Sequence, residues 1–176
     1  MPTNNNYNLP DLLTQLAEQL QTYLSEHQII NPVLVGIERS GVWLAEVLHE
    51  RLQLTEELGT LNISFYRDDY HRAGLPVQTE PSRLPLSLED RHIILVDDII
   101  HTGRTIRAAM NELFDYGRPA SITLAAIVAR QGRELPIEPQ VCVLREEPGK
   151  EYIYQISQEP LRMELVRKAQ GKGLSG

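Results

Sequence analysis

Hydrophobic and polar positions follow two different periods along this chain, and each period predicts one kind of element. Leucines recur at helical spacing across residues 9–24, so one stripe of this segment can face a core. Asn8 stands three residues before Asp11, an arrangement that is typical of an N-terminal helix cap. Apolar residues at helical spacing predict two further helices, across residues 44–52 and 106–114.

Short apolar runs between these segments are typical of strands that are buried on both faces. A stretch that alternates apolar and polar residues is instead typical of a strand with one wetter face. The predicted strands are residues 33–37, the alternating 60–66, 92–96, 121–128 and, from weaker patterns, 141–144 and 152–156. Because strands and helices alternate, the sequence predicts an α/β fold with a mostly parallel sheet flanked by helices.

A long polar, proline-rich stretch interrupts this alternation at about residues 67–91. A connection of this length inside a domain is usually disordered or functional, and is often an active-site lid. We therefore expect a flexible active-site loop there. The sequence contains neither an internal repeat nor an interdomain linker, so we expect one domain over residues 1–166 and a disordered tail over residues 167–176.

Composition narrows the class of protein. The single cysteine, Cys142, excludes an internal disulfide and a cysteine metal cluster. No apolar run approaches the roughly 20 residues that span a bilayer, and the N-terminus lacks the features of a secretion signal. We therefore expect a cytoplasmic protein without a membrane partner. The net charge of −7 argues weakly against nucleic acid, because phosphate binding needs a local excess of Lys and Arg.

The segment from residue 93 to residue 105 carries the most chemical information. An apolar strand leads into the adjacent carboxylates Asp97 and Asp98, and a turn of small polar residues then opens a helix. Ligands of parallel sheets bind beyond the carboxyl ends of the strands. The turn offers backbone N–H groups, the hydroxyls of Thr102 and Thr105 and the positive end of a helix, which together suit a phosphate group.

The two carboxylates would repel that phosphate. We therefore expect Asp97 and Asp98 to accept hydrogen bonds from sugar hydroxyls or to position a cation. Carboxylates beside a phosphate cradle suit a sugar phosphate. The alternative is a strand-to-helix turn with a solvated acidic pair.

The same segment resembles the phosphoribosyl-pyrophosphate (PRPP) signature of the type I phosphoribosyltransferases. Its positions are Ile93, Ile94, Leu95, Val96, Asp97, Asp98, Ile99, Ile100, His101, Thr102, Gly103, Arg104 and Thr105. The resemblance extends over roughly residues 33–139, through residues 34–42, 59–69, 116–121 and 133–137. These stretches are similar to the PyrR family of bifunctional pyrimidine operon regulators and uracil phosphoribosyltransferases.

The resemblance implies a function and a placement of the substrates. Uracil and PRPP would give UMP and pyrophosphate, with Mg²⁺ held mainly by PRPP and no specific protein ligand. Residues 102–105 would hold the 5′-phosphate, and Asp97 and Asp98 the ribose hydroxyls. The pyrophosphate would lie against Glu38, Arg39, Ser40 and Gly41, where Arg39 would add charge-assisted hydrogen bonds. The resemblance also implies a small hood from the terminal segments and a homo-oligomer.

Two further residues are implied near the reaction. Arg67 follows a predicted strand and would act at the base of the closing loop, or would belong to a salt-linked turn. His101 could accept a proton from the base, contact the ribose, or simply pack. Closure of the loop would keep water from an oxocarbenium-like transition state.

The expected base site departs from the family pattern. Relatives read Asp-Arg-Gly-His where residues 129–132 read Ala-Arg-Gln-Gly, and the hood segment that follows also differs. We expect the base near Arg130, Arg133 and Val141, with uracil as the first candidate. A phosphoribosyltransferase for another nucleobase is the alternative.

RNA binding is the second point of departure. In attenuating relatives, the RNA-binding face draws on basic residues of the first helix and on a His-Arg pair. Here the predicted first helix lacks Lys and Arg, and the pair is Gly132-Arg133. Because phosphate contacts supply most of the affinity for RNA, we predict weak or absent attenuation. The other alternative is an RNA-binding regulator that uses PRPP and nucleotides only for sensing.

Overall fold

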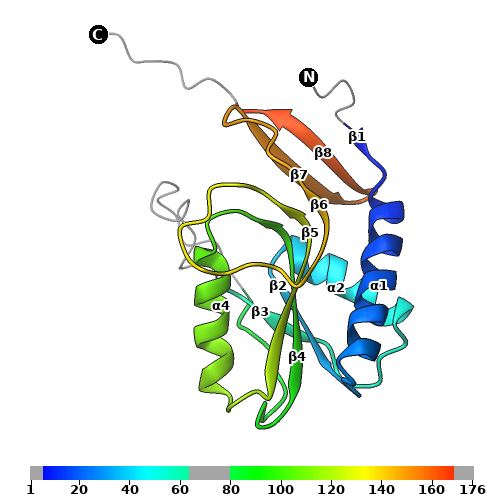
Figure 1. The fold of residues 1–176 in the computed structure, drawn as a ribbon, viewed down its shortest axis with the longest axis vertical. Helices are drawn as coiled ribbons and strands as arrows, with labels where there is room; N and C mark the ends of the chain where they lie inside the picture. Colours follow the sequence, from blue (N-terminus) through cyan, green and yellow to red (C-terminus); the bar gives the residue numbers. More distant parts are fainter. Residues whose placement is uncertain (1–5, 64–79, 169–176) are drawn as a thin grey trace.

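The computed structural model describes residues 6–63 and 80–168 and contains two sheets (Figure 1). The larger sheet has five strands in the order β3-β2-β4-β5-β6, and all of its neighbouring strands are parallel. Its strands are β2 (Val33–Ile37), β3 (Gly59–Leu61), β4 (His92–Ile100), β5 (Ser121–Ala129) and β6 (Val141–Arg145). The predicted α/β fold with a mostly parallel sheet is confirmed.

Helices cover both faces of this sheet. One face packs against α1 (Leu9–Glu26) and α2 (Ser40–Arg51), and the other packs against α4 (Arg104–Asp115) (Figure 1). The predicted cap of the first helix is confirmed, because the Asn8 side chain accepts a hydrogen bond from the Asp11 N–H at 3.2 Å. Among the described residues, no helix is long and apolar enough to cross a membrane.

The hydrophobic core has two halves because successive side chains of a strand point to opposite faces. On β4, Ile93 and Leu95 belong to the half under α4, whereas Ile94 and Val96 belong to the half under α1 and α2. All five residues of β2 are buried, as expected for a strand with helices on both faces. This rigid packing fixes the carboxyl ends of β2 and β4 side by side.

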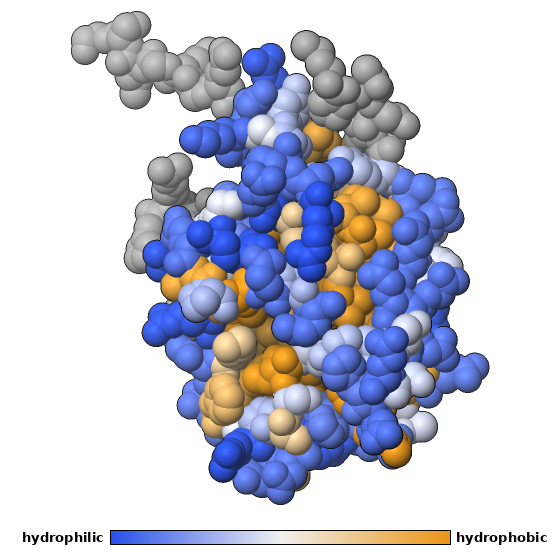
Figure 2. Space-filling view, in the orientation of Figure 1, coloured by the Kyte–Doolittle hydropathy of each residue, from blue (hydrophilic) through white to orange (hydrophobic). Residues whose placement is uncertain are grey.

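The smaller sheet joins the two ends of the chain. It has the order β1-β8-β7, with both pairs antiparallel, and lies at one end of the molecule (Figure 1). Its strands are β1 (Asn6–Tyr7), β7 (Tyr152–Gln158) and β8 (Leu161–Arg167). Figure 2 shows that this end of the molecule is mostly hydrophilic, while apolar atoms appear in patches over the body.

Several boundaries differ from the sequence-based expectations. The strand β8 was not predicted, and the boundary expected at residue 167 is wrong, because Arg167 ends β8 and the Lys168 N–H donates to the Glu151 carbonyl at 2.8 Å. The expected strand 60–66 is a three-residue strand, and residues 64–66 lie outside the described residues. Of the expected loop 67–91, residues 67–79 also lie outside them. Residues 80–91 contain neither helix nor strand and pair with β3 through one bridge, Thr60 to Arg83.

Candidate active site

Two loops that were predicted separately meet at one edge of the large sheet. Strands β2 and β4 pair in parallel, with Gly36 opposite Val96, so the segment that follows β2 emerges beside the acidic pair of β4. A Cβ atom built on Gly41 would lie 2.6 Å from the Val96 carbonyl oxygen and 3.3 Å from the Asp97 Cα. The first turn of α2 therefore rests directly on β4 at the acidic pair. The structure thus brings the residues expected to bind the pyrophosphate close to those expected to bind the ribose.

Close backbone contacts make glycine necessary in this corner. A Cβ on Gly36 would lie 2.7 Å from the Val42 Cα, which no ordinary Cβ contact allows. Ser40 and Gly41 are the first two residues of α2, so they belong to the helix rather than to a loop. Arg39 occupies the N-cap position without a side-chain capping bond, and the Glu38–Arg39 peptide bond is cis. The positive end of α2 thus faces the same edge of the sheet.

The surroundings of Glu38 show how the charges are arranged beside the first turn of α2. Its N–H donates to the Leu61 carbonyl at 2.8 Å, which ties it to β3. Burial raises the pKa of the Glu38 carboxyl, the Glu80 carboxylate adds repulsion, and Arg39 and Arg83 partly offset both effects. The backbone of this segment, rather than the Glu38 carboxylate, is therefore the part suited to an anion.

The acidic pair lies inside β4, not after its end. The expected strand end at Val96 is wrong, because β4 continues to Ile100 through its pairing with β5. The Asp97 side chain is 3% exposed and its Oδ1 accepts from the Asp98 N–H at 2.9 Å. The Asp98 Oδ1 accepts from the Ile99 N–H at 2.7 Å. Both carboxylates are thus oriented by the backbone, and Asp98 is the more exposed of the two.

Residues 101–103 form the turn between β4 and α4, and we call them the phosphate loop because the 5′-phosphate is expected there. Gly103 has φ +93° and is the N-cap of α4, a left-handed conformation that favours glycine. The Thr102 hydroxyl accepts from the Arg104 N–H at 3.2 Å. Since Gly103 provides no side-chain cap, the positive end of α4 can receive an anion.

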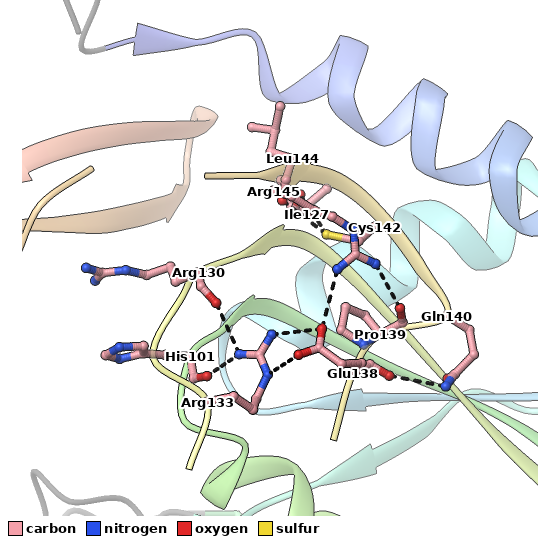
Figure 3. Close-up of polar contacts among 10 residues, drawn as sticks. All are labelled: His101, Ile127, Arg130, Arg133, Glu138, Pro139, Gln140, Cys142, Leu144 and Arg145. Atoms are coloured by element: carbon pink, nitrogen blue, oxygen red, sulfur yellow. Dashed lines mark hydrogen bonds and ion pairs between the residues drawn. The ribbon is translucent and has the colours of Figure 1, made fainter. Parts of the chain in front are cut away.

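The segment 130–140 returns from β5 to β6 and packs against the phosphate loop (Figure 3). A cavity of about 370 Å³ lies along it. The cavity is lined by Ala129, Arg130, Gln131, Gly132, Arg133, Glu138 and Arg145. It includes two of the three residues expected near the base. The third, Val141, is 4% exposed, belongs to the core under α1 and is not among the residues that line this cavity.

Ion pairs hold the arginines of this cavity in place (Figure 3). Arg133 binds both carboxylate oxygens of Glu138, at 2.8 and 3.1 Å, and its side chain is 16% exposed. This hydrogen bonding is the main cause of the lowered pKa of the Glu138 carboxyl, and Arg145, whose NH1 lies 3.4 Å from Glu138, also contributes. Arg133, the cation of the expected RNA-binding pair, is therefore engaged inside the protein.

Arg130 is the most enclosed of these arginines. Its side chain is 9% exposed and its NH2 lies 2.5 Å from the Glu147 Oε1. The Arg130 pair is the main cause of the lowered pKa of the Glu147 carboxyl. Sequence reasoning missed Glu138, Arg145 and Glu147, because their spacing along the chain gives no sign that they meet.

Of the two residues expected near the reaction, His101 and Arg67, the structure describes only His101. His101 is exposed, and its Nε2 lies 3.1 Å from where a Cβ on Gly132 would stand, so its ring lies over Gly132 at the rim of the cavity. Arg67 lies outside the described residues. Among the residues that the structure describes, no group of three or more His, Cys, Asp or Glu side chains could hold a metal ion.

Comparisons with known proteins agree with this geometry. Residues 4–163 match the family model described as phosphoribosyl transferase domain. The chain is 53% identical over 136 residues to the bifunctional protein PyrR of Nitrosococcus oceani, covering 76% of this chain and 77% of that protein. It is 46% identical over 160 residues to the bifunctional protein PyrR of Pseudomonas syringae pv. tomato, covering 90% and 94%.

Solved structures show the same fold. The purine phosphoribosyltransferase of Pyrococcus horikoshii has a TM-score of 0.58 and 26% identity, covering 78% of this chain and 82% of that one. A hypoxanthine phosphoribosyltransferase of Trypanosoma cruzi with IMP has a TM-score of 0.64 and 19% identity, covering 89% and 86%.

Proposed function

This chain belongs to the phosphoribosyl transferase domain family and, within it, to the PyrR family, and from that premise we propose that it converts uracil and PRPP to UMP and pyrophosphate. One observation carries the proposal. The first turn of α2, the acidic pair of β4 and the phosphate loop meet at one edge of the sheet. PRPP is a ribose that carries a phosphate at one position and a pyrophosphate at another. It therefore requires one site for the sugar and one for each of the two anionic parts.

Each part of PRPP would have its own element. The 5′-phosphate would lie in the phosphate loop, against backbone N–H groups and the hydroxyls of Thr102 and Thr105. The ribose hydroxyls would donate to Asp98, while the buried Asp97 holds the Asp98 backbone. The pyrophosphate would lie at the start of α2, within reach of Arg39.

The reaction breaks the bond between the ribose C1 and the pyrophosphate oxygen and forms a bond from C1 to a ring nitrogen of uracil, which loses its proton. Positive charge develops on the ribose as the pyrophosphate leaves, so the site must exclude water. The expected loop at 67–91, including Arg67, would close over the site. Electrostatic stabilisation of the departing pyrophosphate would be the main catalytic effect of Arg39 and of the end of α2.

Magnesium suits this arrangement if the ion is shared with PRPP. Mg²⁺ prefers oxygen ligands and usually takes one or two carboxylates together with substrate phosphates. Asp98 offers a partly exposed carboxylate beside the expected ribose. When bound, the ion would neutralise charge on the pyrophosphate, and PRPP would supply most of its ligands.

The nucleobase would lie at the cavity lined by Arg130, Arg133 and Arg145. Uracil presents two carbonyl acceptors, and arginine offers donors in a fixed geometry. Arg145 is the most exposed of the three, at 56%, and is the best placed to reach a ligand. Because residues 129, 131 and 132 of this cavity and the hood segment that follows differ from the family pattern, another nucleobase is the alternative.

A pyrophosphate-release assay with PRPP, Mg²⁺ and a panel of uracil, hypoxanthine, guanine and xanthine tests the proposal. We expect turnover with uracil and little turnover with the purines. Turnover of a purine without turnover of uracil would overturn the choice of base and leave the family assignment intact.

The roles of the acidic pair have a separate test. The double variant Asp97→Asn/Asp98→Asn should abolish turnover, with a melting temperature close to that of the wild type. Asp115→Asn, an exposed acid at the end of α4, is the matched control and should retain activity. If the double variant binds PRPP at full affinity, the assignment of Asp98 to the ribose, with Asp97 as its support, is wrong.

A second function is suggested by the printed name of the relatives, which calls them bifunctional. The family resemblance implies RNA-dependent regulation of pyrimidine biosynthesis genes, and we propose that this activity is weakened here. The helix α1 carries neither Lys nor Arg, and Arg133 is paired with Glu138. A shift assay with the leader RNA of a pyrimidine operon, at several salt concentrations, checks this. Nanomolar binding that uridine nucleotides enhance would contradict it.

The family resemblance also implies that the chain forms a homo-oligomer, and we propose this for the enzyme in solution. Sedimentation of the full chain should give a mass that is a multiple of 20.0 kDa. A single species of 20.0 kDa at the concentrations used for turnover would contradict it.

A further inference from the structure

The segment 130–138 holds the phosphate loop through the carbonyl groups of His101 and Thr102. The Arg133 NH1 donates to the His101 carbonyl oxygen and, at 3.2 Å, to the Arg130 carbonyl oxygen. The Thr102 carbonyl oxygen accepts from the N–H groups of Glu134 and Leu135, at 2.9 and 3.2 Å. Two consecutive carbonyls of the loop are therefore held on the same outer side.

Because of the geometry of the peptide unit, these contacts also set the directions of two backbone N–H groups of the loop. In a trans peptide unit, the C=O of one residue and the N–H of the next point in opposite directions in one plane. The peptide bonds that follow His101 and Thr102 are both trans. Holding the His101 carbonyl outward therefore turns the Thr102 N–H inward, and holding the Thr102 carbonyl outward turns the Gly103 N–H inward. Inward is the side on which the 5′-phosphate would lie.

Arg133 is itself immobilised before any ligand arrives. Glu138 binds its Nε and NH2 atoms, which leaves NH1 for the two carbonyls. The Arg133 Cδ lies 3.6 Å from where a Cβ on Gly103 would stand, so the side chain also packs against the loop. A planar guanidinium can serve a carboxylate and a carbonyl at the same time, whereas an ammonium group cannot match both directions.

We propose that Arg133, held by Glu138, is a positioning residue that orients the inward N–H groups of the phosphate loop for the 5′-phosphate. This inference rests on the proposed function, because it assumes that the loop binds the 5′-phosphate. It assigns Arg133 no contact with the substrate. Its effect is confined to one of the two anion sites, since the pyrophosphate would be bound at the start of α2.

The experiment compares two ligands that occupy different loops. Ribose 5-phosphate and inorganic pyrophosphate are titrated separately into the full chain by calorimetry. Arg133→Met, which keeps an unbranched apolar side chain but removes the guanidinium, should weaken ribose 5-phosphate binding by about 10- to 100-fold, a loss typical of a misplaced binding group. Pyrophosphate affinity should stay within about twofold, because its loop is untouched. Arg133→Lys and Glu138→Gln should give smaller losses in the same direction.

Arg91 provides the matched control. It pairs with Glu56 at 2.9 Å and donates to the Asn31 carbonyl at 3.4 Å. Although it is the last residue of the expected loop 67–91, it directly precedes the amino end of β4, at the edge of the sheet opposite to the two anion sites. Arg91→Met should therefore leave both affinities unchanged. Equal losses of both ligands in Arg133→Met, or no loss of ribose 5-phosphate, would overturn the inference.

A second measurement does not depend on the stability of Arg133→Met, because it uses Arg133→Lys. In Arg133→Lys without ligand, the backbone amide resonances of Thr102 and Gly103 should shift more than those of the α2 first turn. If the wild type binds neither ligand and shows no turnover, the proposed function and this inference both fail. If the wild type turns over PRPP but Arg133 variants behave like Arg91 variants, only the inference fails.

Discussion

The two sheets of this molecule are stabilised differently. The parallel sheet, which carries the residues expected to bind PRPP, is much more deeply buried than the terminal sheet. In the parallel sheet, β2 is buried throughout and β4 carries an unbroken buried run from Ile93 to Asp97. In the terminal sheet, no residue of β7 is buried, and β8 buries only Met163 and Leu165. A sheet packed on both faces can hold the backbone at its ends rigidly, which the loops for PRPP require.

The terminal sheet is attached through Met163, which belongs to the core under α1 and α2, and through a polar cluster at the edge of the parallel sheet. The hydroxyls of Tyr7 and Tyr154 both donate to the Glu146 Oε1, at 2.6 and 2.5 Å. The two rings lie 5.8 Å apart at 57°. Because Glu146 directly follows β6, this cluster joins β1 and β7 to the edge of the parallel sheet. These hydrogen bonds therefore add to the apolar contacts of Met163 in holding the terminal sheet in place.

The largest difference should come from glycines in the two regions. Gly41→Ala would place a Cβ 2.6 Å from the Val96 carbonyl in the centre of the parallel sheet, and should lower the free energy of unfolding by about 3 kcal/mol. Gly149→Ala, before β7, meets only the movable end of Glu151 at φ +103°, and should cost about 1 kcal/mol. Urea denaturation of both variants measures this. Equal losses would contradict the comparison.

Removal of the Glu146 carboxylate should affect the terminal sheet alone. Glu146→Ala leaves two phenol hydroxyls without their acceptor, and should cost about 1 to 2 kcal/mol. Hydrogen exchange should quicken in β7 and β8 while the amides of β4 keep their protection. Faster exchange in both sheets would show that the two regions unfold together.

Alkaline pH should loosen the same cluster. Burial and then the hydrogen bond to Glu146 raise the pKa of Tyr7 to about 12, and burial likewise raises the pKa of Tyr154. A raised pKa means that the folded state holds its protons more tightly, so the stabilisation is complete below about pH 10 and is lost as the pH rises through about 12. In an absorbance titration, the part of the phenolate signal that appears near pH 12 should be lost in Tyr7→Phe. An unchanged titration would exclude Tyr7 as its source.

The smallest effect should appear in acid, at the Arg133–Glu138 pair. The lowered pKa of Glu138 means that its stabilising effect is present above the ordinary carboxyl range and is lost as the pH falls through the lowered value. A carboxyl-carbon NMR titration should show this pKa rising in Arg133→Lys. The change in stability should be slight, because Glu138 is largely exposed. A Glu138 pKa that does not change in the variant would contradict the arrangement.

Local pattern predicted the parallel sheet because its central strands β2, β4 and β5 are apolar runs that any sheet of this type would bury. The strand β8 was missed although Leu161, Met163 and Leu165 alternate with charged residues, in the period of a strand with one wetter face. Its partners β7 and β1 are visible only in the tertiary structure. Local pattern also ended β4 too early, because two adjacent carboxylates look like the start of a loop. Pairing with β5 as far as Ala129 extends that strand past them.

The sequence by itself determined the helices and buried strands of the main fold and the phosphate loop, because these depend on neighbouring residues along the chain. Only the tertiary structure decided the grip of Arg133 on the loop, the pairs at Glu138 and Glu147, and the fastening of the terminal sheet by Glu146. These contacts join residues brought together by the return of the chain from β5 to β6 and by the meeting of its two ends. No periodicity records such meetings, since charged side chains choose partners by distance in space.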